Sequence, residues 1–239
     1  MLFQVKNIAL MAGLIFLWGL TPVSPSIALF TGAPRMDTSS LSYLALGDSY
    51  TIGESVPIAE RYPVQAVKMM RADHLNIGDP EIIATTGWTT GNLIDALKTY
   101  TAPNTHTIVT ILIGVNNQYQ GRSQSEYRDQ FTSLLQQSIS LAGNKASHVI
   151  VLSIPDYSVT PFARGLNISA IASQIDSFNV INQQIARDLG AQYLDITGES
   201  RKAASDSSLV ARDGLHFSGK EYGIWAALLA PVMKKASEE

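Results

Sequence analysis

The sequence has no cysteine among its 239 residues. A chain without thiols forms no disulfides, carries no lipid on an N-terminal cysteine and has no thiol nucleophile. Charged residues are also few, at 15% of the chain, and the formal net charge is -3. No run of lysine and arginine is present, so the sequence offers no basic surface and we expect no nucleic acid as a partner.

Patterns that bind metal ions are missing as well. The sequence has no His-Glu-x-x-His motif and no cluster of paired carboxylates. His74, His106 and His148 have no partner at metal-ligand spacing, and we expect them to be surface residues. The sequence therefore gives no support for a metal site.

The first 28 residues read as a signal peptide. Lys6 precedes an apolar stretch of 13 residues, 8–20, which is short for a membrane span. Small residues then lead to an expected cleavage after Ala28. The alternative is an uncleaved anchor that extends to Phe30. We expect an exported protein, periplasmic or secreted, that meets a membrane only if this segment stays attached. Residues 29–40 are expected to be a linker and residues 41–239 the folded domain.

Short apolar runs alternate with amphipathic segments along that domain. The runs predict five strands at residues 41–46, 81–84, 107–113, 149–154 and 191–196. Apolar residues three and four apart predict helices at residues 62–72, 92–98, 123–143, 167–190 and 218–234. Pro231 lies inside the last segment, where it either kinks or ends the helix. Ser123 and Glu126 fit a capping box.

This alternation predicts an α/β fold with an open, mostly parallel sheet of five strands covered by helices on both faces. Ligands bind such sheets outside the carboxyl ends of the strands. Ser49, Gly87 and Asn116 each follow a predicted strand. We therefore expect these three residues to meet at one edge of the sheet.

Near the end of the chain, Asp213 precedes His216 by three residues. A serine hydroxyl becomes a useful nucleophile when an imidazole, oriented by a carboxylate, takes its proton. Ser49 is the candidate nucleophile, His216 the candidate base, and Asp213 the candidate carboxylate. The alternative is an Asp that caps a helix before a surface His.

The same edge offers hydrogen-bond donors for an oxyanion. The backbone N–H groups of Ser49 and Gly87 and the side-chain amide of Asn116 could converge on the oxygen that gains charge during acyl transfer. Gly91 is a weaker alternative to Gly87. Asn117 is the rival of Asn116.

Two further segments bear on a substrate pocket. Trp88 either forms a wall of the pocket or fills the core. Residues 155–164 follow a strand and contain aromatic side chains, so this segment either shapes the pocket or is an ordinary loop.

In these motifs the chain resembles the SGNH hydrolase superfamily, also called GDSL-type esterases and lipases. The resemblance covers most of residues 41–233. It implies a flavodoxin-like three-layer α/β/α sandwich, the catalytic residues Ser49, Asp213 and His216, and an oxyanion hole of Ser49, Gly87 and Asn116. It also implies hydrolysis of carboxylic esters, thioesters or sugar O-acetyl groups with no cofactor and no metal, on a small-molecule, glycan or lipid ester.

The chain departs from the family pattern at two positions. Tyr50 replaces the Leu of the Gly-Asp-Ser-Leu motif, and Phe217 follows His216 where many relatives have Pro. Both side chains could border the substrate, which leaves specificity open. The competing Gly-x-Ser-x-Gly elbow of α/β-hydrolases is absent. Two other functions are weaker alternatives: a non-catalytic domain that binds an acylated glycan, and a nucleotide binder, for which a Gly-rich phosphate loop is missing.

Overall fold

The computed structural model describes residues 40–102 and 104–238. The expected signal peptide, and all but the last residue of the expected linker, lie outside the described residues. Within the described residues, no helix combines the length and the apolar character that a membrane span requires.

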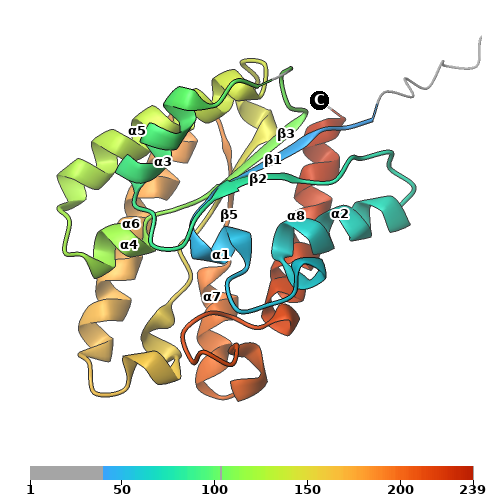
Figure 1. The fold of residues 1–239 in the computed structure, drawn as a ribbon. Coiled ribbons are helices and arrows are strands. Elements are labelled where there is room, and N and C mark those ends of the chain that lie inside the picture. The colour runs from blue at the N-terminus through green and yellow to red at the C-terminus, as the bar shows by residue number, and fades with distance from the viewer. Residues whose placement is uncertain (1–39, 103, 239) are drawn as a thin grey trace, which may run out of the picture. The chain divides into compact units, whose positions relative to one another are not determined.

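Five parallel strands form the central sheet (Figure 1). In sheet order they are β2 (Glu81–Ala84), β1 (Tyr43–Gly47), β3 (Ile108–Leu112), β4 (Val149–Leu152) and β5 (Gln192–Leu194). This 2-1-3-4-5 order is that of flavodoxin-like folds, and the expected α/β class is confirmed. The sheet is entirely parallel, because every strand returns through a helical crossover.

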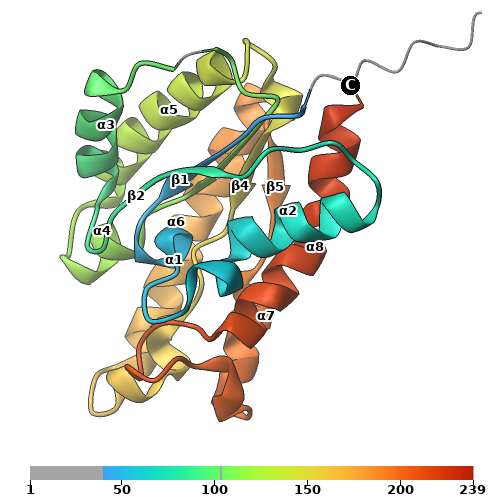
Figure 2. The ribbon, with the colours of Figure 1, turned by 45° about the vertical axis from the view of Figure 1, so that its right-hand side comes forward.

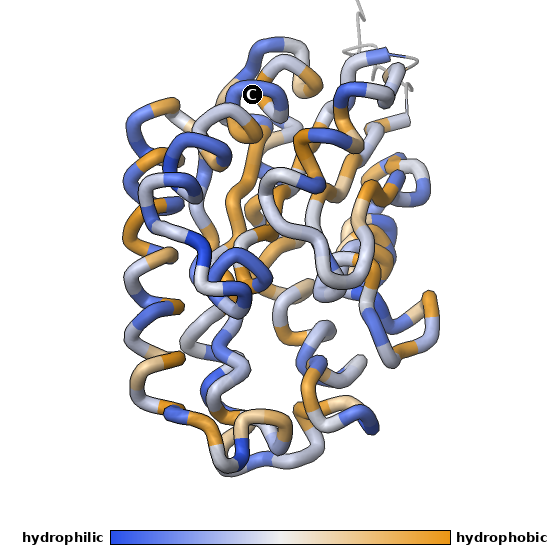
Figure 3. The backbone as a smooth tube through the Cα atoms, turned by 60° about the vertical axis from the view of Figure 1, so that its left-hand side comes forward, coloured by the Kyte–Doolittle hydropathy of each residue, from blue (hydrophilic) through white to orange (hydrophobic). Residues whose placement is uncertain are grey.

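Helices cover both faces of the sheet. On one side lie α2 (Tyr62–Ala72) and α8 (Gly219–Ser237), and on the other lie α3 (Thr90–Thr99), α5 (Gln124–Leu141) and α6 (Ile168–Leu189) (Figures 1 and 2). Buried on both faces, β1, β3 and β4 are built from apolar runs, visible as hydrophobic segments at the centre of the molecule in Figure 3.

The long helices begin and end close to the predicted positions. The side chain of Asn167 accepts a hydrogen bond from the N–H of Ala170 at the start of α6, and Gly190 ends that helix in the left-handed conformation. Ser123 caps α5 through the N–H of Glu126. Helix α8 continues through Pro231 to Ser237, so this proline does not end the helix.

Short helices are the elements that the sequence did not reveal. They comprise α1 (Ser49–Ile52), α4 (Val115–Tyr119), α7 (Thr197–Ser200) and six 3₁₀ turns, η1 (Ile58–Glu60), η2 (Ala146–His148), η3 (Tyr157–Val159), η4 (Pro161–Ala163), η5 (Arg201–Ala204) and η6 (Ser207–Leu209). Helices of four or five residues have too few turns for an amphipathic period. Two of them, α1 and α4, start directly after strands β1 and β3.

The expectation of surface histidines is wrong for two of the three. His148 is buried, and its Nδ1 lies 2.7 Å from the carbonyl oxygen of Thr107, which ties η2 to the segment before β3. His106 is also buried, with Nε2 2.9 Å from the hydroxyl of Tyr100. Only His74 is exposed. Backbone carbonyls and a tyrosine, which spacing rules for metal sites do not consider, supply the partners.

Candidate active site

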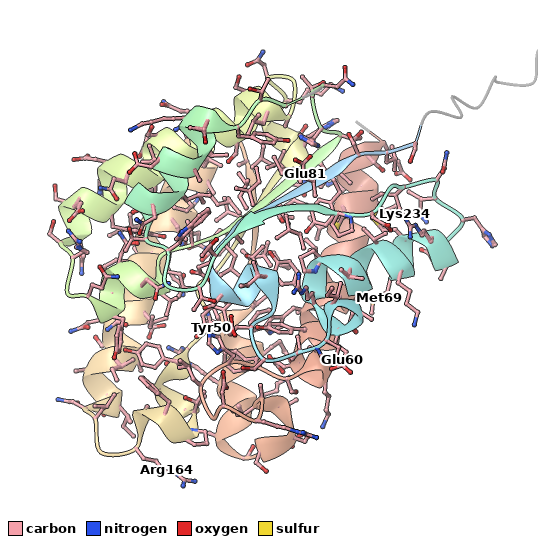
Figure 4. All side chains as sticks on the ribbon, viewed as in Figure 1. Tyr50, Glu60, Met69, Glu81, Arg164 and Lys234 are labelled. Atoms are coloured by element: carbon pink, nitrogen blue, oxygen red, sulfur yellow. The ribbon has the colours of Figure 1, made fainter. Side chains whose placement is uncertain are left out.

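A cavity of about 280 Å³ lies at the carboxyl ends of β1, β2 and β3. Its walls bring together residues from distant parts of the chain: Ser49, Tyr50, Thr86, Gly87, Val115, Asn116, Tyr119, Tyr157, Phe162, Leu215 and His216. Ser49, Gly87, Asn116 and His216, which the sequence singled out, therefore all line one cavity. Figure 4 shows Tyr50, the second residue of α1, at this end of the molecule and Glu81 at the opposite end of the sheet.

Ser49 is the first residue of α1 and is 5% exposed. The chain turns from β1 into this helix without room for a side chain at Gly47, where a Cβ would lie 2.4 Å from the carbonyl oxygen of Leu112 and 2.1 Å from Oγ1 of Thr51. Asp48 then caps α1, because its Oδ1 accepts the N–H of Tyr50 at 3.0 Å. The Gly-Asp-Ser sequence thus fixes the backbone position from which the Ser49 side chain projects.

The carboxyl group of Asp48 is fully buried behind this turn. Burial raises its pKa from 3.8 to about 7, against the lowering effect of the N–H of Tyr50. Its second oxygen, Oδ2, has no hydrogen-bond partner among the described residues. Asp48 is therefore a neutral or partly ionised acid near neutral pH.

Gly87 lies in a tight turn after β2, in which the N–H of Trp88 donates to the carbonyl oxygen of Thr85 at 3.2 Å. The φ angle of Gly87 is 81°, a value that glycine adopts without strain at the third position of a turn. Gly91, the weaker alternative, belongs to helix α3 and does not line the cavity. Of the two glycines, Gly87 therefore lies in the cavity wall.

The structure also separates Asn116 from Asn117. The Nδ2 of Asn116 donates to the carbonyl oxygen of Trp88 at 3.0 Å, which holds α4 against the turn that contains Gly87. An amide nitrogen has two donors, so one remains for a ligand in the cavity. Asn117 is fully buried and makes two hydrogen bonds with Thr90: its Nδ2 donates to the hydroxyl of Thr90 at 2.7 Å, and its Oδ1 accepts the backbone N–H of Thr90 at 3.0 Å. Asn117 is thus a structural link to α3.

Asp213 and His216 form a closed unit in the loop before α8. The Nδ1 of His216 lies 2.5 Å from Oδ2 of Asp213. The other carboxylate oxygen accepts the backbone N–H groups of Leu215 and His216, at 2.9 and 3.0 Å. Partial burial raises the pKa of Asp213, but these hydrogen bonds and one from Ser55 outweigh it and lower the pKa to about 2. The carboxylate is ionised throughout the physiological range.

Ser55 is a contact that sequence reasoning missed. Its hydroxyl donates to Oδ2 of Asp213 at 2.7 Å, across 158 positions of sequence. The φ angle of Ser55 is 67°, in the left-handed region that non-glycine residues rarely adopt. No sequence signal links the two residues, because only the fold brings the loop after α1 to the loop before α8.

The imidazole of His216 is also held from the side. The residue is 7% exposed, and its ring meets that of Tyr50 edge to face with centroids 5.7 Å apart. Phe217 is fully buried, with its ring centroid 5.4 Å from that of Trp225 and 5.8 Å from that of Tyr50, and it does not line the cavity. Of the two departures from the family pattern, only Tyr50 borders the site.

Aromatic rings form much of the remaining wall. Tyr157 and Phe162, from η3 and η4, line the cavity together with Tyr119 from α4. Residues 155–164 therefore do shape the pocket. Trp88 packs against the core instead and is absent from the cavity wall. Among the described residues, no group of three or more His, Asp or Glu side chains is placed to hold a metal ion.

Solved structures with the same architecture are known. The structure of TesA is similar with a TM-score of 0.64 at 15% identity, over 82% of this chain and 99% of that one. A lipase/acylhydrolase from Enterococcus faecalis gives 0.63 at 17% identity, over 82% and 96%. Axe2, an acetylxylan esterase from Geobacillus stearothermophilus, gives 0.59 at 18% identity, over 85% and 97%. At these identities the likeness establishes the fold.

A comparison with curated protein sequences gave no match. The model of the GDSL-like lipase/acylhydrolase family matches residues 45–224, which is most of the chain and includes Ser49, Gly87, Asn116, Asp213 and His216. The fold, the order of the motifs along the chain and this match agree, and the chain belongs to the GDSL-like lipase/acylhydrolase family of the SGNH hydrolase superfamily.

Proposed function

We propose that this protein is an exported serine esterase that hydrolyses carboxylic esters through an acyl-enzyme on Ser49. Membership of the family supports a hydrolase that acts on esters. One observation carries the finer proposal: Ser49, Gly87, Asn116 and His216 line a single cavity. Asp213 supports the role of His216 as the base, because its Oδ2 lies 2.5 Å from Nδ1 of His216.

In the proposed mechanism, Nε2 of His216 takes the proton of the Ser49 hydroxyl as Oγ attacks the acyl carbon. The carbon–oxygen bond to the alcohol then breaks, and His216 gives the proton to the departing oxygen. Water repeats the sequence on the acyl-enzyme and frees the acid and Ser49. Asp213 accepts the Nδ1–H of His216 and so keeps Nε2 available as the base.

The oxyanion of each tetrahedral intermediate would be held by the N–H groups of Ser49 and Gly87 and the free amide donor of Asn116. The N–H of Ser49 is at the first position of a helix, where no intrahelical partner exists. Each such donor is worth about 3 kcal/mol, or roughly a hundredfold or more in rate.

Labelling with a fluorophosphonate tests the activated serine, since the reagent reacts with a nucleophile and not merely with a pocket. We expect stoichiometric labelling of the wild type, none of Ser49→Ala, and hydrolysis of p-nitrophenyl esters by the wild type alone. A Ser49→Ala protein that hydrolyses at the wild-type rate would contradict the mechanism. An unlabelled, inactive wild type would favour the non-catalytic glycan-binding alternative.

The division of labour between Asp213 and His216 has its own test. Asp213→Asn should reduce kcat less than His216→Ala does, because an imidazole that is poorly oriented still accepts a proton. Equal losses in the two variants would contradict the proposed roles.

Export is a separate part of the proposal and depends on residues 1–28. The mass of the mature protein recovered after expression in a secreting host should correspond to a chain that starts at Leu29. Recovery of the full-length chain in the membrane fraction would favour the anchor instead.

A further inference from the structure

The wall of the cavity combines the polar groups that are proposed to react with a larger set of aromatic and aliphatic side chains. Besides Ser49, Thr86, Gly87, Asn116 and His216, it is lined by four aromatic residues and two aliphatic ones. Apart from the tyrosine hydroxyls, these six side chains offer an alcohol or a sugar no hydrogen-bonding group. They suit the hydrocarbon part of an ester.

Three rings close the far part of this wall. Tyr119, Tyr157 and Phe162 pack as a cluster, with centroid separations of 6.1 to 6.2 Å and interplanar angles between 51° and 73°. Tyr157 is buried, while Tyr119 and Phe162 are 58% and 41% exposed although both are large and apolar. The cluster therefore combines one buried ring with two partly exposed rings in the wall of the cavity.

Beyond this wall lies a much larger groove of about 1090 Å³, lined in part by Val159, Leu166 and Ile168. A backbone crossing separates it from the cavity. The N–H of Phe162 donates to the carbonyl oxygen of Gly214 at 2.8 Å, and a Cβ at Gly214 would lie only 3.4 Å from Cβ of Pro161. The cavity and the groove share no lining residue.

The volume of the cavity sets the length of chain that fits. A group the size of a water molecule takes roughly 30 Å³ in a liquid, so a cavity of about 280 Å³ holds roughly nine such groups. The carbonyl carbon and the two ester oxygens take about three of them. About five or six further carbons then fill the rest, so the acyl group has roughly six or seven carbons when its carbonyl carbon is counted.

On the basis of the proposed esterase function, we infer that this cavity is a short acyl site in which the cluster of Tyr119, Tyr157 and Phe162 limits chain length. The substrates are esters of short acyl groups, from acetyl to about hexanoyl, and not of long fatty acids.

The test is a series of p-nitrophenyl esters from acetate to palmitate, measured as kcat/KM below the critical micelle concentrations. For the wild type we expect a rise of up to about fourfold per added methylene, then a fall of tenfold or more by decanoate. A value that keeps rising to palmitate would overturn the inference. So would an unchanged value across the acyl series combined with a strong dependence on the alcohol in a series of acetate esters.

Substitution of the cluster gives a second, independent measurement. Phe162→Ala removes the whole ring and should move the preferred chain upward by about four to six carbons, with a gain of at least tenfold in the ratio of kcat/KM on decanoate to kcat/KM on acetate. Phe162→Leu should fall between. The matched control is Leu228→Ala on α8, where the wild-type residue is 38% exposed and does not line the cavity, and it should keep the wild-type profile.

The two proposals fail in different ways. A wild type that is not labelled by a small diethyl fluorophosphonate, whose substituents fit the cavity, would refute the serine mechanism. A wild type that is labelled on Ser49 but prefers decanoate or palmitate, or a Phe162→Ala variant that is folded by its thermal melt yet has an unchanged profile, would refute only the short acyl site.

Discussion

Replacing Ser55 tests how much the outer contact on Asp213 contributes to catalysis. The Ser55 hydroxyl donates to the same carboxylate oxygen, Oδ2, that faces Nδ1 of His216. Ser55→Ala removes this hydrogen bond and leaves the backbone donors to Oδ1 in place. Ser55→Gly removes the same hydroxyl, but it also relieves the left-handed φ of 67°.

The expected magnitude follows from these contacts. A hydrogen bond to a charged group contributes about 1.5–3 kcal/mol, and the Asp213 side chain is 31% exposed, so water replaces part of it. We therefore expect loss of the Ser55 hydrogen bond to raise the activation free energy by about 1 kcal/mol, which is roughly fivefold in rate. Asp213 stays ionised at pH 7 in both variants, because its pKa starts from about 2. We therefore expect kcat/KM to fall about fivefold in each, through kcat.

Stability separates the two variants. A non-glycine residue in the left-handed region costs about 1 kcal/mol, which corresponds to about 2–4 °C in the melting temperature of a domain of this size. Ser55→Gly should therefore melt above Ser55→Ala by that amount, while both have the same kcat/KM on p-nitrophenyl acetate. Wild-type activity in Ser55→Ala, or a large difference in activity between the two variants, would refute the reasoning.

Two further predictions concern the buried polar groups near the site. Asn116→Ala should lower kcat by about a hundredfold or more, with only a small loss in melting temperature from the missing hydrogen bond to Trp88. Asn117→Ala should mainly lower the melting temperature, because it removes two buried hydrogen bonds to Thr90. The reverse pattern would restore Asn117 as the oxyanion residue. In the folded state the pKa of Asp48 is about 7, and in the unfolded state it is 3.8. The folded state therefore binds more protons between these values and loses stability as the pH rises from 4 to 7. Urea unfolding at pH 4, 6 and 8 should show a loss of up to about 4 kcal/mol in the wild type that is missing in Asp48→Asn, and equal pH slopes would contradict a raised pKa for this carboxyl.

The sequence was sufficient for the sheet and for the long helices. Apolar runs such as 149–154 leave no polar side for solvent, so they predict strands buried on both faces, and caps such as Asn167 and Gly190 mark helix ends by local chemistry. These signals are local, because each depends on residues within a few positions. Their alternation also predicts that Ser49, Gly87 and Asn116 follow strands on one edge.

Local sequence signals do not predict contacts between segments that are distant in the sequence. The choice of Asn116 over Asn117 depends on which amide faces Thr90 in α3, and the role of Ser55 depends on a loop 158 residues away from Asp213. The burial of His106 and His148 has the same origin.

The amino-acid sequence by itself determined the fold class, the order of the motifs and the residue types available for acyl transfer. Only the tertiary structure decided which asparagine enters the cavity, which groups hold Asp213, and how the rings of Tyr119, Tyr157 and Phe162 close the wall. The physical reason is the separation along the chain of the residues that interact. Strand and helix patterns arise from interactions between near neighbours in the chain, whereas a cavity is the space left by segments that meet only after the chain has folded.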